Sequence, residues 1–132
     1  MSNITAFTKT DIEKWDEDRS LKDVPRVTPA TVSFNLPGIE GKAITNYLFI
    51  YTPDGNANFV YTETITAENF HADKKKGSFI TQGKGVYDST AHAATGTFEI
   101  VEGTGTGDLK GIKGKGTLVG TPEHGYHFDV SF

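Results

Sequence analysis

Hydrophobic and polar residues alternate with a period of two along much of the chain, and no long stretch of helix-forming residues interrupts this pattern. Such alternation is typical of β-strands that bury one face. Threonine, valine, glycine and aromatic residues are frequent, which favours the same interpretation. The pattern predicts an all-β protein of about eight strands, at residues 5–15, 27–36, 39–52, 57–66, 79–87, 91–101, 114–121 and 126–132.

Turn-forming residues separate the expected strands closely enough to join neighbours as antiparallel hairpins. The clearest turn is Pro53-Asp54-Gly55-Asn56, where proline presets φ and glycine accepts a left-handed conformation. The acidic segment from Asp16 to Pro25 is expected to be an irregular connection. Eight consecutive antiparallel strands avoid open edges by closing on themselves. The sequence therefore predicts a single domain, residues 1–132, folded as an eight-stranded antiparallel up-and-down β-barrel of lipocalin-like architecture.

Composition narrows the classes of function. The 132 residues include no cysteine, so a thiol nucleophile, a disulfide framework and cysteine-ligated zinc are excluded. Thirteen Lys and Arg against 17 Asp and Glu give a net charge of −4, which argues against nucleic-acid binding. The first ten residues do not resemble a signal peptide, and no apolar run approaches membrane-spanning length. We therefore expect a soluble cytoplasmic protein with neither a nucleic-acid nor a membrane partner.

Some of the expected strands are apolar on both faces. In the strand at residues 39–52, one face carries Ile44, Leu48 and Ile50, and the other face carries three aromatic residues. A strand with two apolar faces requires cover on both sides, and the outer cover is commonly another subunit. The sequence predicts a homo-oligomer.

Glu63 carries the strongest chemical signal, because alternation places this carboxylate on the same strand face as Tyr61 and other apolar residues. Burial of an unpaired carboxylate is costly and raises its pKa. One interpretation is a general acid or base acting on an apolar ligand, with Tyr61, Tyr47 or Gln82 as its hydrogen-bond partner. The other is a structural carboxylate that tyrosine hydroxyls or backbone groups satisfy. The sequence leaves both open.

Two further polar residues are expected on apolar faces. Gln82 alternates with Ile80 and Val86, and His92 alternates with Phe98. Either side chain is suited to orienting a ligand carbonyl or hydroxyl group. Because His92 follows the turn at residues 88–90, a hydrogen bond from it to backbone or water is the alternative interpretation.

Motifs for metals and cofactors are missing. His124 and His127 lie three residues apart, so in an extended strand they point to opposite faces and are not expected to share a metal ion. The glycine-rich segment at residues 103–116 matches neither phosphate-binding glycine motif, and no helix is expected after it. We expect a structural loop there, with one helical turn at residues 108–111 capped by Thr106 or Asp108, and neither a metal nor a cofactor.

Four segments in order together resemble the DUF3224 family of small bacterial proteins and span nearly the whole chain. They are Asn46-Tyr47-Leu48-Phe49-Ile50-Tyr51-Thr52-Pro53-Asp54-Gly55, Glu63 on the next strand, Lys76-Gly77-Ser78-Phe79-Ile80-Thr81-Gln82, and the glycine-rich segment at residues 103–114. Asn46 stands where the family usually has an acidic residue, and Gly83 where a histidine commonly follows the glutamine. The resemblance implies a barrel like that of allene oxide cyclase and dirigent proteins, and an uncharacterised activity.

Three functions remain as hypotheses. The first is binding of a small apolar ligand inside the barrel. The second is a cofactor-free isomerase or cyclase in which Glu63 moves a proton or steadies a cation. The third is a packed oligomeric protein that binds other proteins and holds no ligand. The first predicts a ligand site formed by Tyr47, Tyr61, Glu63, Gln82, His92 and Phe98.

Overall fold

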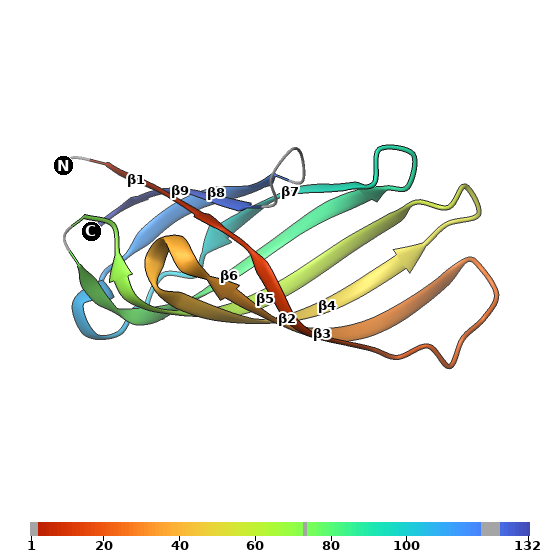
Figure 1. Ribbon diagram of the computed structural model, residues 1–132, viewed down its shortest axis with the longest axis horizontal. Coiled ribbons are helices and arrows are strands. Elements are labelled where there is room, and N and C mark those ends of the chain that lie inside the picture. The colour runs from red at the N-terminus through yellow and green to blue at the C-terminus, as the bar shows by residue number, and fades with distance from the viewer. Residues whose placement is uncertain (1–2, 73, 120–124) are drawn as a thin grey trace.

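A computed structural model describes residues 3–72, 74–119 and 125–132. They form one antiparallel sheet with the spatial order β1-β9-β8-β7-β6-β5-β4-β3-β2 (Figure 1). Two 3-10 turns accompany it, η1 (Pro37–Ile39) and η2 (Gly107–Leu109). The strands are β1 (Ile4–Lys9), β2 (Asp11–Glu17), β3 (Arg26–Leu36), β4 (Gly41–Tyr51), β5 (Ala57–Phe70), β6 (Lys75–Asp88), β7 (Ala93–Ile100), β8 (Lys113–Val119) and β9 (Gly125–Ser131).

The expected all-β antiparallel fold is confirmed, as a strongly curled half-barrel of nine strands. The count differs because the single strand expected at residues 5–15 changes partner at Thr10, so that β1 pairs with β9 and β2 pairs with β3. One continuous segment thus supplies both edges of the sheet, which requires the sheet to curl. The prediction of an irregular segment from Asp16 was wrong at its start, since Asp16 and Glu17 extend β2.

The predicted turn between β4 and β5 is confirmed. Gly55 has a φ of +88°, which favours glycine, and the Asp54 carboxylate accepts hydrogen bonds from the Thr52 hydroxyl (2.5 Å) and the Asn56 amide (3.0 Å). From this turn the two strands pair without a register shift from Tyr51↔Ala57 to Gly41↔Ala67.

Aromatic side chains fill the concave side of the curl. Phe34 on β3 contacts Tyr126 on β9 with ring centroids 6.4 Å apart, and Phe70 on β5 contacts Phe128 on β9 at 5.4 Å. These pairs join strands that are not neighbours in the sheet, so they span its interior. The sheet is therefore held in its curled shape by apolar packing between opposite walls.

Glycines on the inner face lie beneath some of these rings. A Cβ atom at Gly83 would lie 2.8 Å from Cζ of Tyr61, and one at Gly116 would overlap the Phe98 ring and the His127 carbonyl oxygen. Tyr61 pairs with Gly83, and Phe98 pairs with Gly116, across adjacent strands. The missing side chain of each glycine leaves room for the neighbouring ring to lie against the backbone.

The glycine-rich segment packs against the start of β6. The Thr106 hydroxyl accepts a hydrogen bond from the Ser78 amide (3.0 Å), and the Asp108 carboxylate accepts one from the Lys76 amide (3.1 Å). Its helical turn lies at Gly107–Leu109, slightly before the expected position, and Thr106 is its N-cap residue without a side-chain capping bond. Neither described helix has the length or apolar character to cross a membrane.

The close contact at Gly116 yields a first prediction. Gly116→Ala should lower the free energy of unfolding by about 2–3 kcal/mol, because the added methyl group displaces the Phe98 ring or the backbone of β9. Urea denaturation followed by circular dichroism measures this loss. The control is Thr117→Ala on the exposed face of the same strand, which should cost less than about 1 kcal/mol. Equal losses in the two variants would contradict this account of the inner face.

Candidate functional site

Glu63 occupies the middle of β5 and is 1% exposed. Register places it opposite Thr45 on β4 and Thr81 on β6, both fully buried. The expectation that Glu63 shares the inner face with Tyr61 is confirmed. A carboxylate therefore lies deep in an interior that is otherwise mostly aromatic.

One carboxylate oxygen of Glu63 is satisfied and the other is not. Oε2 accepts hydrogen bonds from the Thr45 hydroxyl and from the Tyr126 hydroxyl, the latter at 2.6 Å. Oε1 has no partner among the described residues, and neither do the Tyr61 hydroxyl and the Thr81 hydroxyl. Three buried polar atoms on inward-facing residues of β5 and β6 thus lack hydrogen bonds, although such atoms are normally paired.

Burial sets the protonation of this cluster. It raises the pKa of Glu63 to about 7, even though the hydroxyls of Thr45, Tyr126 and Thr81 favour the charged form. The Thr81 hydroxyl acts on the carboxylate from nearby, although its geometry is not that of a hydrogen bond. Burial, followed by the negative charge of Glu63, also raises the pKa values of Tyr47, Tyr61 and Tyr126 above the ordinary value of 10. These three phenols therefore stay protonated, and Glu63 changes charge near neutral pH.

Aromatic rings enclose the cluster. Tyr47 lies 5.4 Å from Tyr61 between ring centroids, and Phe98 lies 5.7 Å from Tyr126. Trp15 on the edge strand β2 stacks on Phe49 at 5.6 Å and on Tyr47 at 6.3 Å, and it is 41% exposed. The rings give the site apolar walls, and Trp15 closes them at the sheet edge.

A second carboxylate, that of Glu17, lies beside Trp15; the residue is half-buried, with its side chain 3% exposed, and its pKa is shifted in the opposite direction. It accepts hydrogen bonds from the Trp15 indole (3.0 Å), the Thr28 hydroxyl (2.8 Å) and the Tyr51 hydroxyl (2.6 Å), and Arg19 lies 3.6 Å away. Burial alone would raise its pKa, but these donors hold the pKa below the ordinary value of 4.5. Glu17 is thus a charged group that fixes Trp15, whereas Glu63 has donors on only one oxygen.

The predicted site residues separate into two groups. Tyr47, Tyr61, Glu63 and Phe98 all lie on the inner face. Gln82 does not, and its expected inward orientation was wrong, because it pairs with the outward residue Thr62.

His92 also lies outside the interior cluster. It is exposed in the turn between β6 and β7, with a φ of +53°, so its expected alternation with Phe98 was wrong. The reason is that β7 begins only at Ala93, after the turn. A turn residue one position before a strand need not follow the facing of that strand.

Sequence reasoning missed the hydrogen-bonding residues nearest the two carboxylates. Alternation does contain a signal for Thr45, which shares a face with Tyr47, and for Tyr126, which shares one with Phe128. No local signal brings Tyr126 to Glu63, because the two residues are 63 positions apart in the chain. Glu17 was missed because the acidic segment around it was interpreted as a loop.

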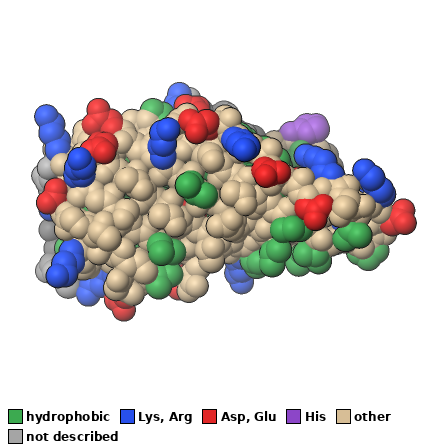
Figure 2. All heavy atoms as spheres, turned by 90° about the horizontal axis from the view of Figure 1, so that it is seen from below, with side chains coloured by type: hydrophobic (Ala, Val, Ile, Leu, Met, Phe, Trp, Pro, Cys, Tyr) green, Lys and Arg blue, Asp and Glu red, His purple; other side chains and the backbone are tan. Residues whose placement is uncertain are grey.

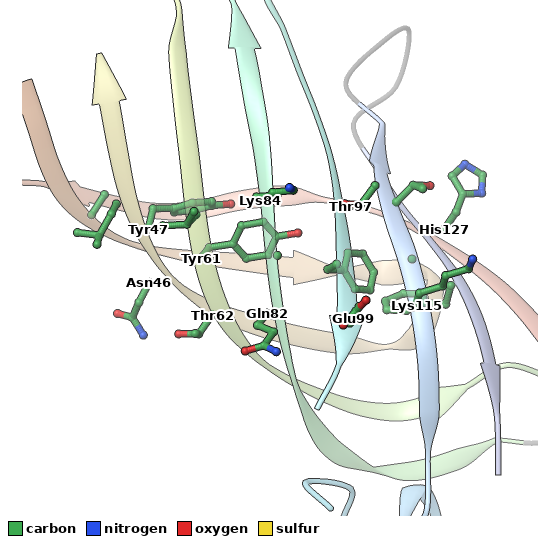
Figure 3. A pocket seen from close by; sticks show the side chains of 18 of the residues that line it. Asn46, Tyr47, Tyr61, Thr62, Gln82, Lys84, Thr97, Glu99, Lys115 and His127 are labelled. Atoms are coloured by element: carbon green, nitrogen blue, oxygen red, sulfur yellow. The ribbon is translucent and has the colours of Figure 1, made fainter. Parts of the chain in front are cut away.

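A hollow of about 1560 Å³ lies across the sheet and not around Glu63. Figure 3 shows its side chains in two rows, one containing Asn46, Thr62 and Gln82, with Tyr47 and Tyr61 between the rows. Most of these side chains are exposed and point away from the core. Glu63, Thr45, Thr81 and Tyr126 do not line it. We interpret this hollow as a groove on the outer face, transverse to the strands.

Metal ligands are not gathered in the described part of the chain. No cluster of three or more His, Asp or Glu side chains suited to a metal ion occurs among those residues. His127 lies on the outer face of β9 with its ring 4.6 Å from that of Phe7, and His124 lies outside the described residues. The groups gathered at Glu63 are a carboxyl group and hydroxyl groups, which can transfer protons and form hydrogen bonds.

Comparison with known proteins identifies the family. The family model described as a protein of unknown function (DUF3224) matches residues 6–130. The fold is similar to the crystal structure of a protein of unknown function, also from this family, from Shewanella oneidensis MR-1. The TM-score is 0.77 at 20% sequence identity, covering 99% of this chain and 98% of that one. No curated protein matches the chain. The chain therefore belongs to the DUF3224 family of proteins of unknown function, as the motifs around Tyr47, Glu63 and the glycine-rich segment predict.

Proposed function

We propose that this protein binds a small, mainly apolar molecule on the inner face of its curled sheet. The observation that carries the proposal is the set of three buried, unpartnered polar atoms: Glu63 Oε1, the Tyr61 hydroxyl and the Thr81 hydroxyl. We propose further that the curled sheet corresponds to the eight-stranded barrel expected from the sequence. In this correspondence β1 and β2 count together as one bent strand.

Unsatisfied polar atoms favour a guest with a hydrogen-bonding group. Each buried donor or acceptor without a partner costs about 1–3 kcal/mol, so a ligand atom that bonds to two or three of them gains that energy on binding. The surrounding rings of Tyr47, Tyr61 and Phe98 suit an apolar body. A single internal water molecule would form hydrogen bonds with the polar atoms, but it would make no apolar contacts with the surrounding rings.

The protonation state of Glu63 determines which polar group a ligand should carry. Below pH 7 the Glu63 carboxyl is mostly neutral and both donates and accepts, and the Tyr61 and Thr81 hydroxyls do the same. A carbonyl or hydroxyl oxygen is the group that such a set recognises best. Phosphates and carboxylates are disfavoured, because a buried carboxyl group that ionises near neutral pH would repel them.

The route to the site lies at Trp15. The interior is occupied by packed rings, so a ligand must displace side chains to enter. Trp15 is partly exposed, sits on the edge strand β2 and covers Tyr47 and Phe49. Movement of this one side chain would expose inner-face rings without breaking the sheet.

A catalytic role for Glu63 is the second candidate. A carboxyl group with a pKa of about 7 is matched to general acid or base catalysis at neutral pH. Protonated phenols from Tyr61 and Tyr126 beside it would stabilise an oxyanion. A cofactor-free isomerase or cyclase acting on the bound molecule would use the same contacts.

Ligand entry should be visible in the intrinsic fluorescence, because Trp15 is the only tryptophan of the chain. Titration with small apolar ketones and alcohols should shift the fluorescence emission of Trp15, and the shift should reach saturation. Tyr61→Phe combined with Thr81→Val should weaken binding about tenfold or more, since two hydrogen-bonding groups are lost. Native mass spectrometry checks the stoichiometry and any copurified compound.

The control for this titration is Gln82→Ala, which removes an outward polar side chain next to Thr81 and should leave binding unchanged. Equal affinity of the wild type and the double variant would contradict the proposed anchor. If the wild type converts a bound compound to a product and the Glu63→Gln variant does not, the catalytic candidate is favoured.

Glu63 should also make stability depend on pH. Its pKa in the folded protein, about 7, exceeds the ordinary 4.5, so its favourable contribution is complete below pH 4.5 and is lost as the pH rises through 7. Glu63→Gln, which stays neutral, should match the wild type near pH 4.5 and exceed its unfolding free energy by up to about 3 kcal/mol at pH 8.

Urea denaturation of both proteins at several pH values measures this difference. Glu99→Gln is the control, since it replaces a carboxylate on the exposed outer face by the same amide. A difference between Glu63→Gln and wild type that stays constant from pH 4.5 to 8 would show that Glu63 is not buried as a neutral acid.

A further inference from the structure

The outer face of β3 to β6 forms a regular grid of four strands by four positions. Pairing across these strands has no register shift over the grid, so the outward residues align in rows. We call this surface the β3–β6 face. Its rows are Val27, Ile50, Asn58 and Val86; Pro29, Leu48, Val60 and Lys84; Thr31, Asn46, Thr62 and Gln82; and Ser33, Ile44, Thr64 and Ile80.

This face concentrates the exposed apolar side chains of the molecule. Among the described residues, twelve large hydrophobic side chains are exposed, and seven of them belong to the β3–β6 face. Figure 2 shows hydrophobic side chains gathered over one part of the surface. The seven, each 37–54% exposed, are Val27, Ile44, Leu48, Ile50, Val60, Ile80 and Val86. Five of the seven lie in the two adjacent rows that begin at Val27 and Pro29, and a polar row separates them from Ile44 and Ile80. Exposed apolar side chains gathered in this way mark an interaction site.

The face also carries almost no charge. Fifteen of its sixteen positions are uncharged, and the exception, Lys84, lies at the border with β7. The outer face of β7 to β9 differs, since it displays Glu99, Lys113, Lys115 and Asp129. A charged partner finds little to pair with on the β3–β6 face. A second identical face meets it without like-charge repulsion, because Lys84 at the rim can extend into solvent.

The edges of the sheet are poor alternatives for self-association. The edge strands β1 and β2 have six and seven residues, and β2 carries charged side chains, including Asp11, Glu13 and Lys14. Short, charged edges disfavour pairing with another sheet. Self-association is therefore directed to a face of the sheet.

We propose that two copies of this chain form a two-fold symmetric dimer through the β3–β6 face. With ~4.8 Å between strands and ~3.4 Å per residue, the grid measures roughly 19 Å by 23 Å. The product, roughly 440 Å² in projection, is about half of the ~800 Å² per partner of a standard interface, so we expect a weak, reversible dimer. The transverse groove between the Asn46 row and the Leu48 row can receive a ridge of the partner's side chains. The proposal does not depend on the interior site.

Sedimentation velocity from about 1 to 100 μM tests the dimer. The wild type should shift from monomer to dimer as the concentration rises through this range. Leu48→Lys with Val60→Lys should raise the dimer dissociation constant at least a hundredfold, because each copy brings two new charges beside Lys84 into the interface. Both positions are exposed, so the circular dichroism spectrum and melting temperature should stay close to those of the wild type.

Two further proteins complete the test. Ile12→Lys with Leu21→Lys places the same charges on exposed apolar positions outside the face and should leave the dimer intact. Leu48→Glu with Val60→Glu should be monomeric alone but should form a heterodimer with the lysine variant, as expected when like positions face each other. A monomeric wild type at 100 μM, a lysine variant that remains dimeric, or no heterodimer would each overturn the proposal.

Discussion

The register of β3 to β6, which is unbroken over the sixteen positions of the β3–β6 face, is the constraint on which both surfaces of this protein depend. Successive side chains point to opposite faces, so the pairing that puts Tyr47, Tyr61 and Glu63 inside also puts Leu48, Val60 and Thr62 outside. A slip of one residue would move Glu63 into solvent and bury a row of threonines. The interior cluster and the β3–β6 face are therefore two consequences of one alignment.

The two interior carboxylates show how local hydrogen bonding decides the state of a group. Glu17 is half-buried and Glu63 is fully buried, and the pKa of Glu17 is lowered whereas that of Glu63 is raised. Glu17 lies near the sheet edge, where donors reach both of its oxygens. Glu63 lies mid-sheet, where its neighbours supply donors to Oε2 alone. Oε1 is left without a hydrogen-bond donor among the described residues.

Much of the candidate site follows from alternation alone. The inward positions of Tyr47, Tyr61, Glu63 and Phe98 are set by strand periodicity once a strand is identified. Gln82 and His92 were misplaced for two physical reasons: a strand's facing depends on its partner's register, and a turn interrupts periodicity. The nine-strand count was missed because no local feature marks the change of partner at Thr10.

The sequence by itself determined the strands, the main turns and the two-sided character of β4 and β5, because these follow from short-range periodicity and turn chemistry. Only the tertiary structure decided that β1 and β2 lie at opposite edges and that Tyr126 reaches Glu63. It also decided that Glu63 Oε1 and the hydroxyls of Tyr61 and Thr81 find no hydrogen-bond partner among the described residues. Those features arise from contacts between residues distant in the chain, which local patterns do not encode. The curl of the sheet is what brings them together.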